Sequence, residues 1–289
     1  MSDLGGTAVT SFGSTGLSNA DASRGTAAER ASLALKRLLL GSPLEPLAFG
    51  LSHQIAPLVR TALHPALSAI YYENNYQFKA VRRVVTPSMN CIDVGAHIGL
   101  FLRAFERFAP LGAHLAVEPL AWKAGPLRRK FPNATILQCA LAERAGKSVF
   151  VEDLERSACS GLGAHWRARD EARDVREIAV DAQTLDAIAL TGPPIGLIKL
   201  DVEGAETAVL KGGAGLIERD RPVILFECGA SLAETDADEN PFDVLTGRFG
   251  YRVFTVRNFV FGHADLTRDC FNFCRRYPAT AFNFAAVPR

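Results

Sequence analysis

Four acidic residues at the carboxyl ends of two apolar, strand-like segments could carry acid–base or cation-binding chemistry. They are Asp201, Glu203, Glu206 and Glu227. If the strand that ends near Leu200 continues, Asp201 and Glu203 point to one face, and Lys199 shares that face. Glu206 would then lie in the first turn of a helix, where the helix dipole favours a carboxylate.

Carboxylates that converge at one sheet edge perturb each other's pKa values, and such groups mark functional sites. Three uses are open for this cluster. It could bind a divalent metal through hard oxygen ligands, with Asp201 and Glu227 as the candidates. It could supply a general base for an acceptor hydroxyl, or it could hold the hydroxyls of a sugar or nucleoside. Capping of a helix N-terminus is the structural alternative.

A second candidate site begins at residues 91–99, with the sequence Cys-Ile-Asp-Val-Gly-Ala-His-Ile-Gly. The apolar start predicts a buried strand, and Asp93 stands where it ends. Gly95 and Gly99 predict a tight turn that lets a ligand approach the backbone, and His97 lies between them. The spacing is not that of the dinucleotide-binding glycine motif. Asp93 suits a cationic or hydroxyl-rich ligand better than a pyrophosphate.

The next two predicted strands add a nucleoside-binding pattern. Glu118 follows the strand predicted over 114–117, where doubly wound sheets place an acidic residue that accepts from ribose hydroxyls. The strand predicted over 135–139 ends beside Ala140, at the edge where adenine contacts are made in this fold. Glu118 could instead be a solvated side chain, but motifs on successive strand tips favour a nucleoside site.

These motifs need a parallel sheet that brings the strand tips to one edge. Six or seven predicted strands alternate with helices, which indicates an α/β fold with a doubly wound, mostly parallel sheet. Residues 149–151 predict a strand of an added hairpin. Residues 121–131 and 241–249 predict helices, and the polar, aromatic segment 71–76 predicts a linker.

Composition divides the chain into three parts. Residues 1–26 are rich in Gly, Ser, Thr and Ala, which predicts a flexible tail. Residues 27–85 predict a helical N-terminal extension that prolines interrupt. Residues 86–289 carry all the motifs and predict the α/β domain.

The 289 residues are 48% hydrophobic and 22% charged, which allows one large domain with a substantial core. The net charge of +1 gives no support to nucleic acid or an anionic membrane as a partner. No apolar run reaches the about 20 residues of a membrane span, and residues 1–30 lack the regions of a secretory signal. Six cysteines without zinc-binding spacing lead us to expect a reducing cytoplasm.

Several of these segments together resemble the FkbM-type S-adenosylmethionine-dependent methyltransferases. They are residues 93–99, 118–119, 184–186, 198–206 and 210–212, within a similarity that covers about residues 91–229. The Asp-Val-Glu-Gly-x-Glu block at 201–206 is the specific part. The resemblance implies a Rossmann-like fold of the class I methyltransferase type. It also implies S-adenosylmethionine as cofactor and methyl transfer to a hydroxyl of a small molecule or glycan, of the polyketide or sugar type.

The resemblance also implies roles for single residues. Asp93, Gly95 and Gly99 would line the methionine part of the cofactor, and Glu118 would contact its ribose. An alcohol is a poor nucleophile, so a base or a metal should help to remove its proton. Asp201 is the first candidate for that base, followed by Glu203 and Glu227.

Two positions depart from the pattern of the family. His97 stands where the family usually has Asn, and it can also hydrogen-bond there. Cys228 stands where a His often follows the acidic residue, which leaves a non-catalytic nucleoside-binding module as one alternative. A nicotinamide-dependent sugar-nucleotide enzyme is the other, and it is disfavoured by the glycine spacing and the lack of a Tyr-x-x-x-Lys pair.

Overall fold

The computed structural model describes residues 70, 72–154, 160–163, 174–189, 191–229, 239–276 and 279–289. The tail predicted over residues 1–26 lies outside the described residues. The same is true of the predicted extension up to residue 69, so only the end of that extension is described here.

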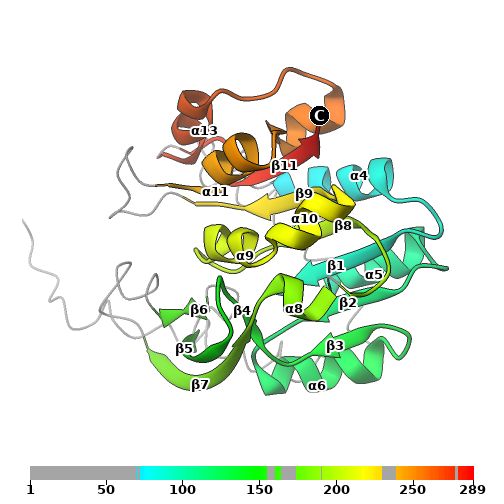
Figure 1. Cartoon of the computed structure of the whole chain (residues 1–289), viewed down its shortest axis with the longest axis vertical. Coiled ribbons are helices and arrows are strands. Elements are labelled where there is room, and N and C mark those ends of the chain that lie inside the picture. Colours follow the sequence, from blue (N-terminus) through cyan, green and yellow to red (C-terminus); the bar gives the residue numbers. More distant parts are fainter. Residues whose placement is uncertain are drawn as a thin grey trace, which may run out of the picture.

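Seven strands of the described residues form one sheet, in the order β10-β11-β9-β8-β1-β2-β3 (Figure 1). They are β1 (Asn90–Val94), β2 (His114–Val117), β3 (Thr135–Leu137), β8 (Ile195–Leu200), β9 (Val223–Glu227), β10 (Tyr251–Thr255) and β11 (Asn283–Pro288). Strand β11 is antiparallel to both its neighbours, and the other pairings are parallel. The strand order reverses between β1 and β8, and ligands of such sheets bind beyond the carboxyl ends at this point.

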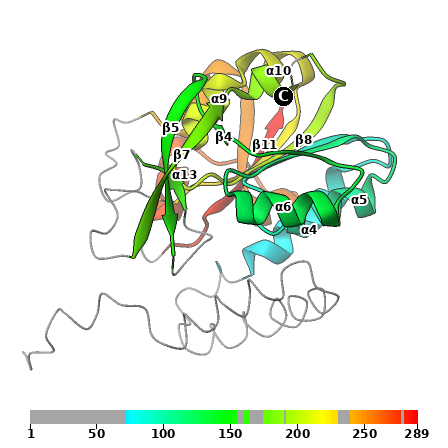
Figure 2. The ribbon, with the colours of Figure 1, turned by 90° about the horizontal axis from the view of Figure 1, so that it is seen from below.

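Helices cover both faces of this sheet. Figure 2 shows α9 and α10 on one face and α4, α5 and α6 on the other. The helices are α4 (Glu73–Val84), α5 (Leu100–Phe108), α6 (Ala121–Lys130), α8 (Leu185–Ala189), α9 (Glu206–Gly212), α10 (Ala214–Asp220), α11 (Pro241–Asp243), the π-helical turn η3 (Val244–Arg248), α12 (Val256–Phe261) and α13 (Arg268–Arg275). The predicted doubly wound, mostly parallel sheet is therefore confirmed.

Burial on both faces explains the continuous apolar run of β8. Ile198 and Leu200 belong to one hydrophobic cluster with Val209 of α9. Leu197 points to the opposite face and belongs to a second cluster with Leu102 of α5. A central parallel strand has no solvated face, so it shows no polar alternation.

A second sheet, here called the small sheet, has the strand order β4-β7-β5-β6 within the described residues. Its strands are β4 (Ala140–Leu141), β5 (Gly146–Asp153), β6 (Gly161–Leu162) and β7 (Val175–Gln183). The predicted hairpin strand at 149–151 is part of β5, which pairs antiparallel with β7. The predicted third strand at 135–139 is shorter than expected, because β3 ends at Leu137 and the chain then joins the small sheet.

Two local predictions differ from the structure, and some helices were not predicted. The predicted linker over 71–76 is wrong, because α4 begins at Glu73. The first turns of α4 bury the polar residues Glu73 and Gln77, so apolar periodicity predicted a helix only from Phe78 and did not reveal where it begins. The helix predicted over 241–249 is α11 followed by η3. Helices α10, α12 and α13 were not predicted.

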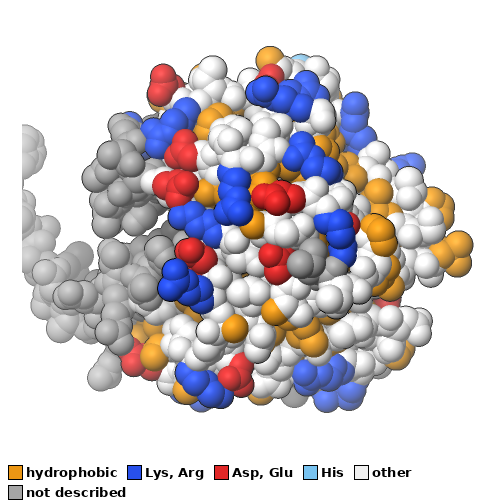
Figure 3. Space-filling view, in the orientation of Figure 1, with side chains coloured by type: hydrophobic (Ala, Val, Ile, Leu, Met, Phe, Trp, Pro, Cys, Tyr) orange, Lys and Arg blue, Asp and Glu red, His pale blue; other side chains and the backbone are white. Residues whose placement is uncertain are grey.

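Basic and acidic side chains are interspersed on the face shown in Figure 3. Among the described helices, none has the length and apolar character needed to span a membrane.

Candidate functional site

A cavity of about 480 Å³ lies beyond the carboxyl ends of β1, β2, β8 and β9. Eight of the nine residues predicted for cofactor binding or catalysis line it. They are Asp93, Gly95, His97, Glu118, Ala140, Asp201, Glu203 and Glu227. The ninth, Gly99, is not a lining residue. The fold thus brings together segments that are more than a hundred residues apart in the sequence.

Gly95 lets two strand ends approach each other. Its φ of +77° lies in the left-handed region, and a Cβ there would be 1.8 Å from the carbonyl oxygen of Asp201. The expected reason for Gly95 was the close approach of a ligand. The structure shows instead the close approach of the neighbouring strand end at Asp201. Gly99 also has a positive φ, and a Cβ there would lie 2.4 Å from the ring of Phe131. Packing against α6 and the start of α5 accounts for Gly99.

Asp93 is buried beneath the cavity. Its Oδ2 accepts the backbone N–H of Leu102, in the first turn of α5, at 3.1 Å. Burial raises the pKa of Asp93 to about 7, although the nearby Lys199 ammonium opposes this rise. Asp93 thus joins the glycine turn to α5 and also presents a polar group to the cavity.

Glu118 is buried at the end of β2 and holds the backbone around the cavity. Its Oε2 accepts the N–H of His97 at 2.9 Å, and its Oε1 accepts the N–H of Leu120 at 3.0 Å. Burial raises the pKa of Glu118, and the ammonium of Lys123 is the main opposing influence. Lys123 also lines the cavity. Each carboxylate oxygen keeps a further lone pair that a ligand hydroxyl could use.

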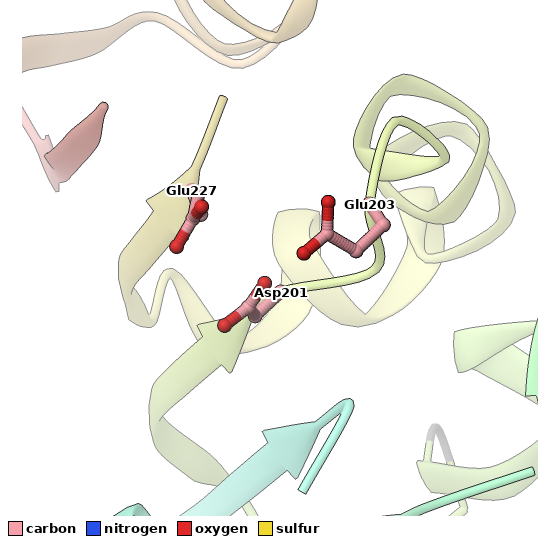
Figure 4. Close-up of side chains that lie close together, drawn as sticks. All are labelled: Asp201, Glu203 and Glu227. Carbon is pink, nitrogen blue, oxygen red and sulfur yellow. The ribbon is translucent and has the colours of Figure 1, made fainter. Parts of the chain in front are cut away.

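Asp201, Glu203 and Glu227 form a carboxylate cluster at the other end of the cavity. One carboxylate oxygen from each lies within 4.8 Å of the others. Figure 4 shows their side chains turned toward one another, from the ends of β8 and β9 and from the loop after β8. The predicted convergence of these carboxylates is therefore confirmed.

The reason predicted for this convergence is wrong, because β8 ends at Leu200 and does not continue through Glu203. Glu203 has a φ of +53°, so a left-handed loop turns its side chain toward Asp201. Glu206 holds this loop, since its Oε1 accepts the N–H groups of Val202 and Gly204 at 3.3 and 3.1 Å. The capping alternative does not describe Glu206, because the N–H groups that it accepts lie in the loop before α9 and the N-cap of α9, Ala205, has no side-chain cap.

Lys199 supplies a buried positive charge beside the cluster. Its Nζ lies 3.0 Å from Oδ2 of Asp201 and 5.0 Å from the centre of the Phe101 ring. Burial raises the pKa of Glu227 well above its usual value, and the charge of Asp201 raises it further. A cavity with more carboxylates than ammonium groups favours a ligand that brings positive charge.

Sequence reasoning missed several lining residues. They are Lys123, Asn74, Phe150, Ser160 and Leu162. Lys199 was placed on the face of Asp201 but was given no role, although a lysine inside an apolar strand must find a partner when it is buried. The residues from α4 and the small sheet had no such signal, since only the tertiary fold brings them to the cavity.

Comparison with known proteins identifies the family. Residues 93–253 match the profile of the methyltransferase FkbM domain. The chain belongs to this family. The predicted class, a methyltransferase enzyme, is therefore confirmed. No curated protein matches the sequence of the chain.

Solved structures of methyltransferases are distantly similar to this FkbM-domain protein. Methyltransferase FkbM from Methylobacillus flagellatus KT is 18% identical with a TM-score of 0.36, and the match covers 50% of this chain and 34% of that chain. This chain thus matches about a third of the length of that relative. A TehB-like SAM-dependent methyltransferase from Corynebacterium glutamicum ATCC 13032 Kitasato is 9% identical with a TM-score of 0.39. That match covers 74% of this chain and 87% of the other.

Proposed function

We propose that this FkbM-domain protein is an S-adenosylmethionine-dependent O-methyltransferase that acts on a hydroxyl of a small molecule or a glycan. The observation that carries the proposal is the single cavity lined by both predicted motifs, the glycine turn with Glu118 and the carboxylate cluster. Its volume of about 480 Å³ lies in the range of small-molecule sites, roughly 300–1,000 Å³.

The residues of the cavity fit the chemistry of this cofactor. Glu118 offers acceptor lone pairs to ribose hydroxyls at the tip of β2, and Ala140 begins β4 beside it. Asp93 and the glycine turn would border the methionine part. The excess of carboxylates suits a sulfonium cation, whereas it would repel the pyrophosphate of a nicotinamide cofactor.

When bound, S-adenosylmethionine supplies a methyl group on a positively charged sulfur. The protein must then hold an acceptor oxygen close to that methyl group and in line with it, and this positioning supplies much of the acceleration. Asp201 is the proposed base for the acceptor proton, because it lines the cavity at the end of β8 and Lys199 Nζ, 3.0 Å from its Oδ2, holds its carboxylate in place. Burial favours the protonated form of Glu227, which can donate a hydrogen bond to the acceptor or to Asp201.

The three clustered carboxylates also suit a hard divalent cation. In that arrangement Asp201 and Glu227, with Glu203, would be the ligands, and the ion would help to remove the proton of the acceptor. We propose the base role first, because Lys199 already provides a positive charge at Asp201.

Calorimetric titration with S-adenosylhomocysteine, in magnesium and in EDTA, tests the cofactor. We expect micromolar dissociation constants in both buffers. Tighter binding in the magnesium buffer than in EDTA would assign the carboxylate cluster to a metal. Methyl-labelled S-adenosylmethionine, incubated with a panel of sugars and alcohols, then tests transfer to oxygen. Folded protein that binds NADH but not S-adenosylhomocysteine would overturn the proposal. Binding without transfer to any acceptor would favour the non-catalytic module.

We place this reaction in the cytoplasm. The described cysteines are free thiols, namely Cys91, Cys139, Cys228, Cys270 and Cys274. Free thiols are usual in a reducing compartment.

A further inference from the structure

We propose that the small sheet is a wall of the cofactor site, and that Glu152 positions this wall by bridging Trp122 of α6 and Arg176 of β7. This inference rests on the proposed function, because it assigns the small sheet to the same S-adenosylmethionine site. Glu152 is here a positioning residue, since it is not among the residues that line the cavity.

The small sheet contributes much of the cavity wall. Five lining residues come from its strands or directly precede one, and they are Ala140, Leu141, Phe150, Ser160 and Leu162. Phe150 is only 6% exposed and is the largest side chain among them. The width of the cavity beside Ala140, where we place the adenosine, therefore depends on where β5 lies.

Glu152 ties β5 to α6, the helix that follows Glu118. Its side chain is fully buried, and its Oε1 accepts the indole N–H of Trp122 at 2.7 Å. Its Oε2 accepts from Nε and Nη2 of Arg176 at 3.1 and 2.5 Å. Glu152 and Phe150 are two residues apart on β5, so their side chains leave the same face of the strand. A hydrogen bond that fixes Glu152 against α6 thus also fixes Phe150 against the cavity.

The small sheet also touches the loop that carries the carboxylate cluster. A Cβ at Gly161 of β6 would lie 3.1 Å from the carbonyl oxygen of Glu203, so the two backbones are in close contact. The wall is therefore held at two places, by Glu152 near the adenosine and by Gly161 near the acceptor. A shift of the sheet would change the shape of the cofactor site without removing any of its polar groups.

The first test is Trp122→Phe, which removes the indole donor and keeps an aromatic ring. We expect S-adenosylhomocysteine and adenosine to bind about fivefold to tenfold more weakly by calorimetry, less than the full effect of losing one buried hydrogen bond to a charged group, because Trp122 acts on the site only through Glu152. Tyr251→Phe is the matched control, because it removes a buried hydroxyl that donates to the carbonyl of Pro222 at 2.9 Å, away from the cavity. The control should leave both dissociation constants unchanged.

A purely structural role would lower the melting temperature without changing affinity in the folded protein. A double-mutant cycle of Trp122→Phe with Phe150→Leu separates the two roles. If the network acts through Phe150, the combined loss of affinity is smaller than the product of the single losses. If the loss of affinity in the double variant equals the product of the two single losses, the inference is overturned.

Arg176→Met is a second variant, on the half-exposed side of the bridge. It should weaken S-adenosylhomocysteine binding, and Arg176→Lys should restore part of the affinity. Unchanged affinity in both Trp122→Phe and Arg176→Met, beside normal wild-type binding, would overturn the positioning role alone. Absence of wild-type binding would overturn the proposed cofactor as well, so the two failures are distinguishable.

Discussion

Glu118, at the end of β2, accepts the backbone N–H of His97 at 2.9 Å, and this bond joins the acidic residue of the second strand to the glycine turn of the first. His97 has a φ of +50°, a conformation that Asn and His adopt more readily than most residues. The Asn that the FkbM family usually has at this position suits the same backbone. The departure at residue 97 is therefore compatible with the turn, and the shape of the turn depends on Glu118.

Glu118→Ala should weaken S-adenosylhomocysteine binding by about a hundredfold or more, because it removes both the proposed ribose acceptor and the bond that orders the turn. Glu118→Gln keeps one acceptor oxygen and should lose less. Calorimetry gives both dissociation constants. Glu143→Ala, an exposed acidic residue, is the control. Equal affinity in wild type and Glu118→Ala would contradict the assignment of Glu118 to the cofactor.

Gly95→Ala should destabilise the fold strongly. The added Cβ would lie 1.8 Å from the carbonyl oxygen of Asp201, and the φ of +77° is unfavourable for alanine. Gly247→Ala is the matched control, since no atom lies within 4 Å of its added Cβ and its φ is not in the left-handed region. Gly247 lies in η3, so alanine there should be neutral or stabilising. Thermal denaturation compares the two variants, and similar melting temperatures would contradict the close approach of β1 and β8.

The acidic residues at the strand ends could be predicted from sequence. A buried parallel strand is an apolar run in the sequence, so the first acidic residue after that run marks its carboxyl end. Asp93, Glu118, Asp201 and Glu227 all follow this rule. The FkbM motif resemblance gave the family, which the profile match confirms. Strand alternation does not explain why Glu203 lies in the cluster. Its position depends on its left-handed backbone, which is set by the loop that Glu206 holds.

The rest of the site depends on contacts between distant segments. Phe150 and Glu152 lie on β5, of which the sequence predicts only a strand of an added hairpin, and Glu152 is buried where Trp122 of α6 donates to it. Glu73 and Gln77 begin α4 with polar side chains whose partner, Asn283, is about two hundred residues away. No local sequence pattern predicts such pairings. Each of these polar residues is typical of a solvated position, and its buried partner lies far away in the sequence.

Asp201→Asn should lower methyl transfer by roughly 10²–10⁴-fold if Asp201 is the base. Its affinity for S-adenosylhomocysteine should change little, because Glu118 and the glycine turn remain intact. Single-turnover transfer from methyl-labelled S-adenosylmethionine and calorimetry separate the two effects. Asp265→Asn, on an exposed loop, is the control for the loss of one acidic charge. Full transfer activity in Asp201→Asn would move the base role to Glu203 or Glu227.

Glu73 should make the stability of the fold depend on pH. It is buried at the start of α4, where it accepts the backbone N–H groups of Phe282 and Asn283 at 3.0 and 3.2 Å. Burial raises its pKa from 4.5 to about 7. The folded state therefore binds this proton more tightly than the unfolded state does. The resulting stabilisation is complete below about pH 4.5 and is lost as the pH rises through about 7.

Glu73→Gln cannot ionise, so its free energy of unfolding should fall less than that of the wild type between about pH 4.5 and pH 8. At about 1.4 kcal/mol per pKa unit, the difference should be of order 3 kcal/mol. Urea denaturation across this range measures it, with Glu143→Gln as the exposed control. Asp93, whose pKa is also raised to about 7, contributes equally to all three proteins and cancels in the comparison. Parallel stability curves for wild type and Glu73→Gln would contradict this prediction. They would show that Glu73 stays ionised throughout this pH range, because the hydrogen bonds to its carboxylate lower its pKa as much as burial raises it.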